Sequence, residues 1–74
     1  MKIDPLSSEH PYKQLAAQLR AQIEGGAITS QLPSITDLTA RTGLAVGTVR
    51  RAIDILVKEG LVQTVPGRGT FVTR

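Results

Sequence analysis

The chain has 74 residues, a length that suits one domain and leaves too small a core for a separate ligand cavity. It contains no cysteine, which excludes disulfides, thiolate catalysis and cysteine-ligated zinc and is typical of a reducing compartment. No apolar run approaches the ~20 residues that cross a bilayer. The polar residues 1–11 lack the apolar segment of a secretory signal. We therefore expect a soluble, cytoplasmic domain without a membrane partner.

The basic residues are concentrated in the C-terminal half. The net charge is +3 at pH 7. Six basic residues against two acidic ones give residues 41–74 a charge of +4, whereas three basic and four acidic residues give residues 1–40 a charge of −1. Most of the C-terminal cations are arginines, whose planar guanidinium suits phosphates and guanine edges. This distribution is compatible with a polyanionic partner, although a solvated basic surface would produce the same excess.

Residues 11–24 are predicted to form an amphipathic helix. Apolar residues recur there at helical spacing, at Tyr12, Leu15, Ala16, Leu19 and Ile23. Pro11 suits the first turn of the helix and Gly25-Gly26 suits its end. Because the polar face is mostly glutamine, the helix is expected to pack in a core and not to lie on a membrane. Residues 1–10 are predicted to be a flexible N-terminal arm, and residues 11–74 to form the folded domain.

A short second helix is predicted from Ser34 to about Thr42. Residues 27–32 before it are compatible with a short strand, which Pro33 would end. Ser34 and Asp37 form a capping box, in which the serine hydroxyl accepts from the amide three residues on. Gly43 is expected to end this helix.

A third helix is predicted from about residue 46 to residue 59. Its apolar positions lie on one side, at Val49, Ala52, Ile53, Leu56 and Val57. The residues on the opposite side are Gly47, Arg50, Arg51 and Asp54. Gly60 is expected to stop the helix.

A β-hairpin is predicted at the C-terminal end. Two β-prone runs, residues 61–65 and 70–73, flank the turn Pro66-Gly67-Arg68-Gly69, and a turn rich in Pro and Gly between such runs is typical of a hairpin. Phe71 is expected in the core. The fold is therefore predicted to be mainly α with a small β-hairpin: a winged helix-turn-helix of three helices and a two-stranded wing.

A helix-turn-helix presents the outward residues of its second helix to the DNA major groove. Those residues are predicted to be Gly47, Thr48, Arg50 and Arg51. Arginine can bridge guanine O6 and N7, although Arg51 could instead pair with Asp54 one turn on. Arg68 would lie at the tip of the wing, where Gly67 and Gly69 let the backbone approach a sugar-phosphate strand or a minor groove.

Five short fragments of the sequence strengthen this interpretation. They are Pro11-Tyr12-Lys13-Gln14-Leu15, Leu32-Pro33-Ser34, Thr48-Val49-Arg50, Glu59-Gly60-Leu61-Val62 and Gly67-Arg68-Gly69-Thr70-Phe71-Val72. In their order and spacing they resemble the DNA-binding domain of the GntR family of bacterial transcription regulators, over about residues 11–73. The resemblance implies a domain that binds operator DNA, usually as a dimer on a palindrome, and usually as a repressor released by a small metabolite.

The family's C-terminal effector and dimerisation domain does not lie within these 74 residues, so we expect no effector molecule to bind this segment. The chain is expected to be either an excised domain, which we favour, or a naturally minimal regulator.

The sequence departs from the family pattern at two places. The family has an arginine two residues after the serine of Leu-Pro-Ser, where this chain has Thr36, and a Ser-Arg or Thr-Arg pair where it has Ala45-Val46. Of three family arginines with base-reading roles, only Arg50 remains. We expect either an altered operator, in which Val46 and Thr36 meet thymine methyl groups, or reduced specificity. The missing hydroxyl cap is expected to weaken the start of the third helix by about 1 kcal/mol.

No catalytic or metal-binding pattern is found in the sequence. His10 has no cluster of partners at ligand spacing, the carboxylates are scattered, and no nucleophile–base pair or nucleotide-binding fingerprint is present. We therefore expect no enzymatic activity, no metal and no cofactor. The two aromatic residues argue against single-strand binding, which depends on aromatic stacking.

The sequence thus predicts a sequence-specific, double-stranded DNA-binding module of a bacterial transcription regulator acting as a repressor. Residues 46–59 would lie in the major groove and residues 66–69 on the minor groove or backbone. The residues predicted to contact DNA are Ser34, Thr36, Val46, Gly47, Thr48, Arg50, Arg51, Gly67, Arg68 and Gly69. A homodimer is expected, on DNA or through a C-terminal domain. The alternative is a winged-helix protein-interaction module that has lost base-reading residues, which the apolar Ala45-Val46-Gly47 would favour.

Overall fold

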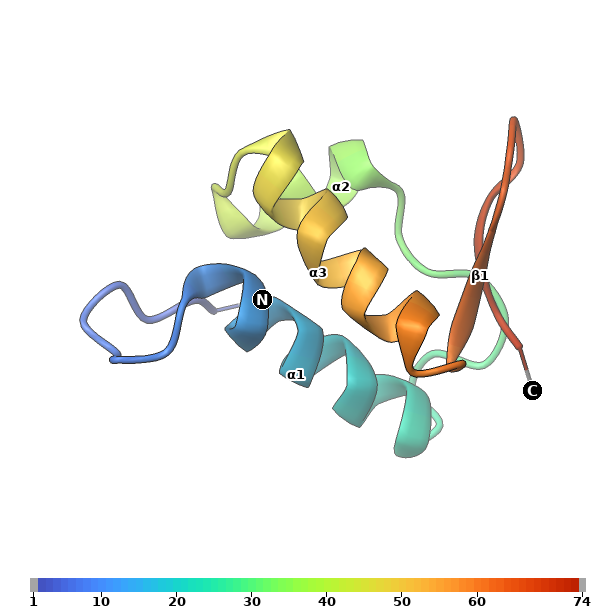
Figure 1. The fold of residues 1–74 in the computed structure, drawn as a ribbon, viewed down its shortest axis with the longest axis horizontal. Coiled ribbons are helices and arrows are strands. Elements are labelled where there is room, and N and C mark those ends of the chain that lie inside the picture. Colours follow the sequence, from blue (N-terminus) through green and yellow to red (C-terminus); the bar gives the residue numbers. More distant parts are fainter. Residues whose placement is uncertain (1, 74) are drawn as a thin grey trace.

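Three helices and one hairpin follow one another along the chain (Figure 1). The computed structural model describes residues 2–73, so Met1 of the predicted arm and Arg74 of the predicted domain lie outside the described residues. The elements are α1 (Pro11–Glu24), α2 (Ile35–Thr42), α3 (Val46–Lys58), β1 (Val62–Val65) and β2 (Gly69–Val72), and the two strands are antiparallel. The predicted winged helix-turn-helix is therefore confirmed, with helix bounds within one residue of those expected.

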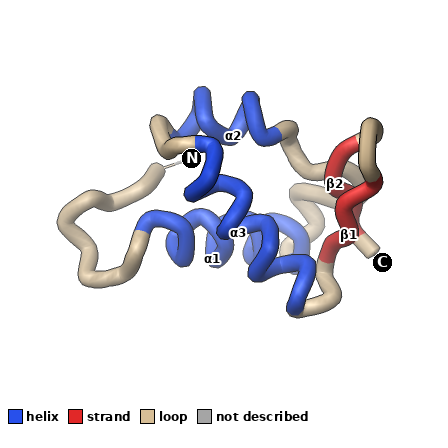
Figure 2. Tube along the Cα trace, turned by 45° about the horizontal axis from the view of Figure 1, so that its top comes forward, coloured by secondary structure: helices blue, strands red, loops and turns tan. Residues whose placement is uncertain are grey.

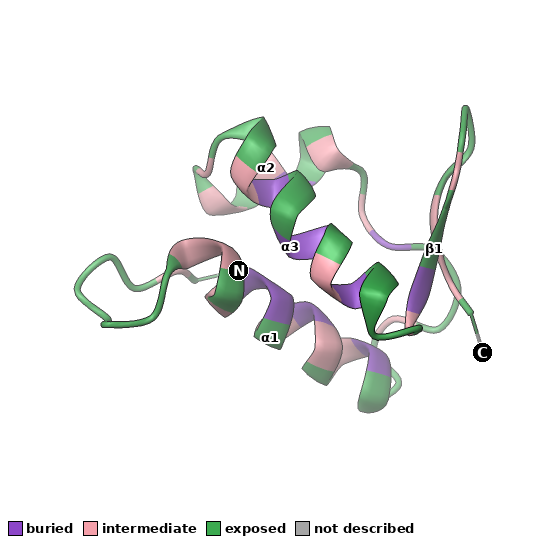
Figure 3. Cartoon of the chain, viewed as in Figure 1, coloured by how far each residue is buried: buried purple, intermediate pink, exposed green. Residues whose placement is uncertain are grey.

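The core lies between the three helices and the base of the hairpin. In Figures 1 and 2, α1 and α3 lie side by side, α2 packs near the start of α3, and the hairpin stands at the other end of α3. The buried residues gather on the facing sides of the helices, as Figure 3 shows, and include Leu15, Leu19, Leu38, Val49, Leu56 and Val62. Val57, on the predicted apolar side of the third helix, is 38% exposed, because it lies at the margin of the apolar arc of α3.

The helix ends follow the local sequence. The Ser34 hydroxyl accepts from the Asp37 amide at 3.0 Å, which confirms the predicted cap of α2, and Gly43 ends this helix with a φ of 72°. Ala45 caps α3 with an extended backbone but without a side-chain hydrogen bond. Gly60 follows the end of α3 with a φ of 76°, a left-handed conformation that glycine adopts without strain.

The turn of the hairpin is one residue shorter than predicted, and β1 and β2 are four residues long each, against predicted runs of residues 61–65 and 70–73. Gly69 belongs to β2 and pairs with Val65, which leaves residues 66–68 as the turn. The Arg68 amide donates to the Val65 carbonyl at 3.0 Å, and Gly67 has a φ of 74°, as a Pro-Gly type II turn requires. Phe71 is half-buried and not in the core, because side chains alternate along β2 and Val72 takes the core-facing side.

The segment 27–32 does not form the short strand that its sequence allowed. Only Gln31 forms an isolated bridge, to Phe71 at the outer edge of β2. The Leu32 amide donates to the Thr70 carbonyl at 2.9 Å, and the Val72 amide donates to the Ser30 carbonyl at 2.7 Å. The segment therefore runs along the edge of the hairpin for a few residues and fixes it to the body of the domain.

The residues before α1 contact that helix through glutamine side chains. Gln14 Nε2 donates to the carbonyl oxygens of Asp4, at 2.9 Å, and Glu9, at 2.8 Å, and Gln18 donates to that of Lys2. Ile3 packs against the core. The predicted flexibility of this arm stays a prediction.

Candidate nucleic-acid interface

The outward side of α3 is polar and solvent-exposed. Val46, Gly47, Arg50, Arg51 and Asp54 are all exposed, whereas Thr48 is half-buried. Successive residues of a helix differ by 100° in direction. Arg50 and Arg51 therefore point toward different flanks of the same surface, and the structure gives them different neighbours.

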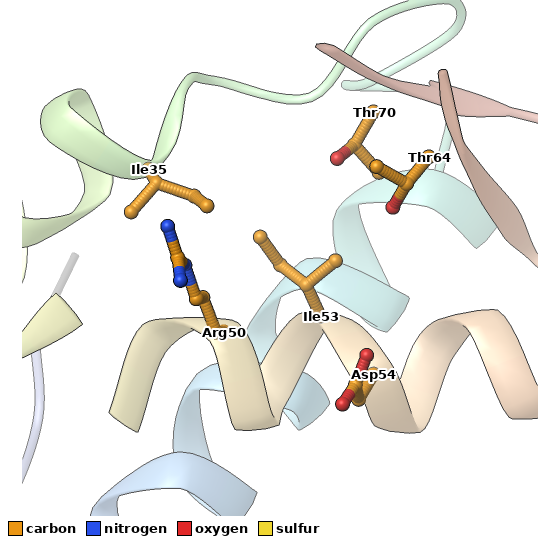
Figure 4. Close-up of a pocket in the computed structure, with 6 residues that line it drawn as sticks. All are labelled: Ile35, Arg50, Ile53, Asp54, Thr64 and Thr70. Carbon is orange, nitrogen blue, oxygen red and sulfur yellow. The ribbon is translucent and has the colours of Figure 1, made fainter. Parts of the chain in front are cut away.

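Arg50 lies on the flank of α3 that faces the wing. Figure 4 shows its guanidinium directed toward Ile35, at the start of α2, with Ile53 beside it and two threonines of the hairpin across the gap. A hollow of about 340 Å³ separates these elements, lined by Ile35, Arg50, Ile53, Asp54, Thr64 and Thr70. The Arg50 guanidinium thus lies at the edge of a concave surface that joins the start of α2, the outward side of α3 and the wing.

A second hollow, of about 380 Å³, continues this surface between the start of α2 and the wing. It is lined by Pro33, Ser34, Ile35, Thr36, Thr64, Val65, Pro66, Gly67, Arg68, Gly69 and Thr70. Ile35, Thr64 and Thr70 line both hollows, so we call them together the α3–wing groove. Its rim carries Arg50 on one side and Arg68 on the other.

Arg51 lies on the flank of α3 that faces α1. Its guanidinium carbon is 4.2 Å from the centre of the Tyr12 ring, a cation–π contact. The His10 ring stacks on Tyr12 with ring centres 5.7 Å apart. Arg51 therefore stacks on Tyr12, and the ion pairs of residues 2–73 do not include the alternative pairing of Arg51 with Asp54.

The arginines of this surface have no carboxylate partners within residues 2–73. The ion pairs of that range are Arg20–Glu59, at 2.7 Å, and Arg41–Asp37, at 3.8 Å. The guanidiniums of Arg50, Arg51 and Arg68 remain available for an anion. Arg20 and Glu59 join α1 to the end of α3 through two hydrogen bonds, and this contact lowers the pKa of the Glu59 carboxyl below its ordinary value.

The structure brings six of the ten predicted residues to the α3–wing groove. They are Ser34, Thr36, Arg50, Gly67, Arg68 and Gly69. Val46 and Gly47 lie at the exposed start of α3, outside the lining of the groove, and Arg51 lies on the other flank. Thr48 is half-buried in the first turn of α3, also outside that lining.

Three polar residues of the groove were not predicted. Thr64 and Thr70 pair across the hairpin, on the same face as the core pair Val62 and Val72. Their alternation could have revealed them, because the wing extends beyond the core and its inner face becomes polar there. Asp54, four residues after Arg50, is the third. The sequence places Asp54 on the polar side of the third helix, but no motif in the sequence indicates a role for it in the groove.

The comparison with known families decides the identity of this arrangement. Residues 11–72 match the family described as "Bacterial regulatory proteins, gntR family". The chain belongs to the GntR family. Its members are regulatory proteins, so the chain is a GntR DNA-binding domain and not an enzyme. The resemblance found in the sequence is thereby confirmed.

Named relatives and solved structures support this assignment. The "HTH-type transcriptional repressor NagR" of Bacillus subtilis (strain 168) is 38% identical over 76 residues, covering 100% of this chain and 31% of the relative. A solved structure of "YtrA from Sulfolobus acidocaldarius, a GntR-family transcription factor" has a TM-score of 0.87 at 35% identity, covering 97% of this chain and 78% of that one. The GntR domain of this chain therefore spans less than a third of the length of NagR.

The similarity extends to a neighbour solved with DNA. The structure of "AraR(DBD) in complex with operator ORE1" has a TM-score of 0.89 at 32% identity, covering 99% of this chain and 98% of that one. The GntR domain and this operator-bound neighbour thus share the same fold over nearly their whole lengths.

Among the described residues, no helix is long and apolar enough to span a membrane. Residues 2–73 likewise contain no group of three metal-ligating side chains close enough to hold an ion.

Proposed function

We propose that this GntR domain binds double-stranded operator DNA, with α3 in the major groove and the tip of the wing on the backbone or in the adjacent minor groove. The observation that carries the proposal is the α3–wing groove, which joins the outward side of α3, the start of α2 and the wing in one concave surface with Arg50 and Arg68 at its rim. An α-helix with side chains is about 10–12 Å across, which matches a major groove about 12 Å wide.

The residues of the proposed interface divide into two groups: readers, which would contact base edges, and anchors, which would contact phosphates. Arg50, with Val46, Gly47 and Thr36, is proposed to meet base edges, because these residues lie at the start of α2 and on the exposed first turns of α3. Arginine is suited to guanine, and the methyl groups of Val46 and Thr36 are suited to thymine. Base contacts carry the sequence preference.

The anchors are proposed to contact phosphates. Ser34, Thr48, Arg51 and the wing residues Gly67, Arg68 and Gly69 lie around the readers, and hydroxyls, guanidiniums and accessible backbone amides are the groups that proteins use for phosphate contacts. Arg51 is held by Tyr12 at 4.2 Å, which places its charge at the α1 flank. Phosphate contacts position the domain and make affinity depend on salt.

The longer regulator is proposed to act as a repressor on a palindrome. Two copies of this fold would read half-sites one helical turn apart, or a multiple of it, either by pairing on DNA or through a dimerisation domain. NagR is named a transcriptional repressor, and an effector that releases DNA would bind outside this domain. Such a regulator would work in the cytoplasm, where its DNA lies.

The experiment that tests DNA binding is a fluorescence-anisotropy titration of the domain with duplex DNA over a salt series. Binding with a log–log salt slope of several units is expected, because several phosphates lose their counterions on contact. The variant Arg68→Glu should weaken binding and flatten this slope. A protein-interaction module, which the 48% exposure of Val46 would favour, would instead show no duplex binding at low salt and would tolerate the charge reversal.

A further inference from the structure

The tip of the wing is held by one side chain from outside the hairpin. Gln31 Nε2 donates a hydrogen bond to the Arg68 carbonyl oxygen at 3.2 Å. Within residues 2–73 no other side chain forms a hydrogen bond with residues 66–69. Gln31 thus contacts the backbone of Arg68, whose side chain lies on the wing side of the rim of the α3–wing groove.

The register of the backbone explains how Gln31 reaches the tip. Gln31 lies opposite Phe71 at the outer edge of β2. Side chains alternate along a strand, so Phe71 and Gly69 share one face of β2, and the side chain of Gln31 lies on that face too. This face is opposite to the one that carries Thr70 toward α3. Gln31 therefore supports the wing from behind and does not enter the α3–wing groove.

Gly69 provides the space that this contact needs. A Cβ atom at position 69 would lie 2.7 Å from Gln31 Nε2, which is inside van der Waals contact. Gly69 also has a φ of +124°, a conformation that side chains disfavour. Because Gly69 has no side chain, the side-chain amide of Gln31 can cross β2 at this position and reach the carbonyl oxygen of Arg68.

We infer that Gln31 is a positioning residue for DNA binding, which holds the wing so that Arg68 is presented to DNA in one orientation. The inference rests on the proposed function. Residues 30 and 32 fix the base of the hairpin through backbone hydrogen bonds to Val72 and Thr70, but the tip beyond them is a two-stranded ribbon, which is only marginally ordered by itself. Ordering a loop during binding reduces affinity. A tip that is ordered before DNA arrives avoids that loss. Gln31 thereby acts on affinity through Arg68, without touching DNA itself.

The test is a double-mutant cycle between Gln31 and Arg68. Gln31→Met removes the donor and keeps the length of the side chain. Gln63→Met is the matched control, because Gln63 pairs with Phe71 from the other strand and is exposed. Affinity for duplex DNA is measured by anisotropy at a temperature where circular dichroism shows every variant folded.

Gln31→Met should weaken binding by about 3- to 10-fold, the effect of one neutral hydrogen bond. In the Arg68→Ala background the same change should have almost no effect, and Gln63→Met should leave the affinity unchanged in either background. In the free protein, NMR order parameters of the backbone amides at residues 67 and 68 should fall in Gln31→Met and not in Gln63→Met.

A loss of equal size in both backgrounds would overturn the inference, because it would show a role independent of Arg68. So would unchanged affinity and unchanged order parameters in Gln31→Met while Arg68→Ala weakens binding; the proposed function would then stand. If Arg68→Ala itself left the affinity unchanged, the wing contact of the proposed function would be wrong, and the inference would fall with it.

Discussion

Arg50 and Arg51 are adjacent in the sequence, but their removal should have different consequences for DNA binding. Arg50 lies at the rim of the α3–wing groove beside Ile35, where it can reach a base edge. Arg50→Ala should therefore remove one bidentate contact, which corresponds to about 1–3 kcal/mol, or roughly 5- to 150-fold, of discrimination against a wrong base. The loss should appear on the operator and be much smaller on a scrambled duplex.

Arg51 lies 4.2 Å from the Tyr12 ring on the other flank of α3. Arg51→Ala should weaken binding to the operator and to the scrambled duplex by the same factor and should reduce the log–log salt slope by about 1, as expected for one phosphate contact. The quantity that separates the two arginines is the ratio of the two affinities. Arg50→Ala should lower this ratio, whereas Arg51→Ala should leave it unchanged.

Lysine variants provide the control for charge. A lysine ammonium serves a phosphate as a point charge but lacks the planar fork of arginine. Arg51→Lys should therefore restore most of the affinity, and Arg50→Lys should not restore the ratio. The reasoning is refuted if Arg50→Ala leaves the ratio intact, or if Arg51→Ala lowers it as much as Arg50→Ala does.

Three further predictions concern the stability of the domain. Ala45→Ser should supply the side-chain cap that α3 lacks, raise the free energy of unfolding by about 1 kcal/mol and raise Tm by roughly 4–8 °C. The control Ala17→Ser, at an exposed position inside α1, should raise neither quantity. Equal melting curves for Ala45→Ser and the native chain would contradict this account. Gly47→Ala, where a Cβ would meet nothing within 4 Å, should raise the free energy of unfolding in urea by about 0.5–1 kcal/mol while weakening DNA binding. An unchanged affinity for DNA would show that binding does not need a helix surface without a side chain at position 47. The Arg20 contact lowers the pKa of Glu59 in the folded domain, so the stabilisation from this ion pair is present above the unfolded pKa of the carboxyl and is lost as the pH falls through the folded pKa. Glu59→Gln should therefore lower the free energy of unfolding at neutral pH and not in acid. A difference in the free energy of unfolding between Glu59→Gln and the native chain that persists at low pH would count against this assignment.

The helices and the hairpin could be predicted because each is encoded locally. Apolar spacing placed α1 and α3, Ser34 and Gly43 marked the ends of α2, and the Pro-Gly turn indicated the wing. The turn was predicted one residue too long because Gly69 resembles a turn residue in the sequence, whereas in the structure it pairs with Val65. The placement of Phe71 was wrong because the face of a strand depends on its register with its partner.

The contacts that connect distant parts of the chain could not be predicted from spacing. Tyr12 and Arg51 meet only because α1 packs beside α3 in one particular orientation. Gln31 reaches the wing only because the segment 30–32 runs along the edge of β2. The part that each site residue has in binding DNA stays a prediction.

The measurement that tests the central claim most directly is selection of duplexes by the domain from a random-sequence library, followed by anisotropy of the selected sequence over a salt series. The account predicts enrichment of one motif, with half-sites that repeat as a palindrome, and a salt slope of several units. Arg50→Ala should then select a different or weaker motif. Binding that enriches no sequence, or no duplex binding at low salt, would contradict the claim that this domain reads an operator.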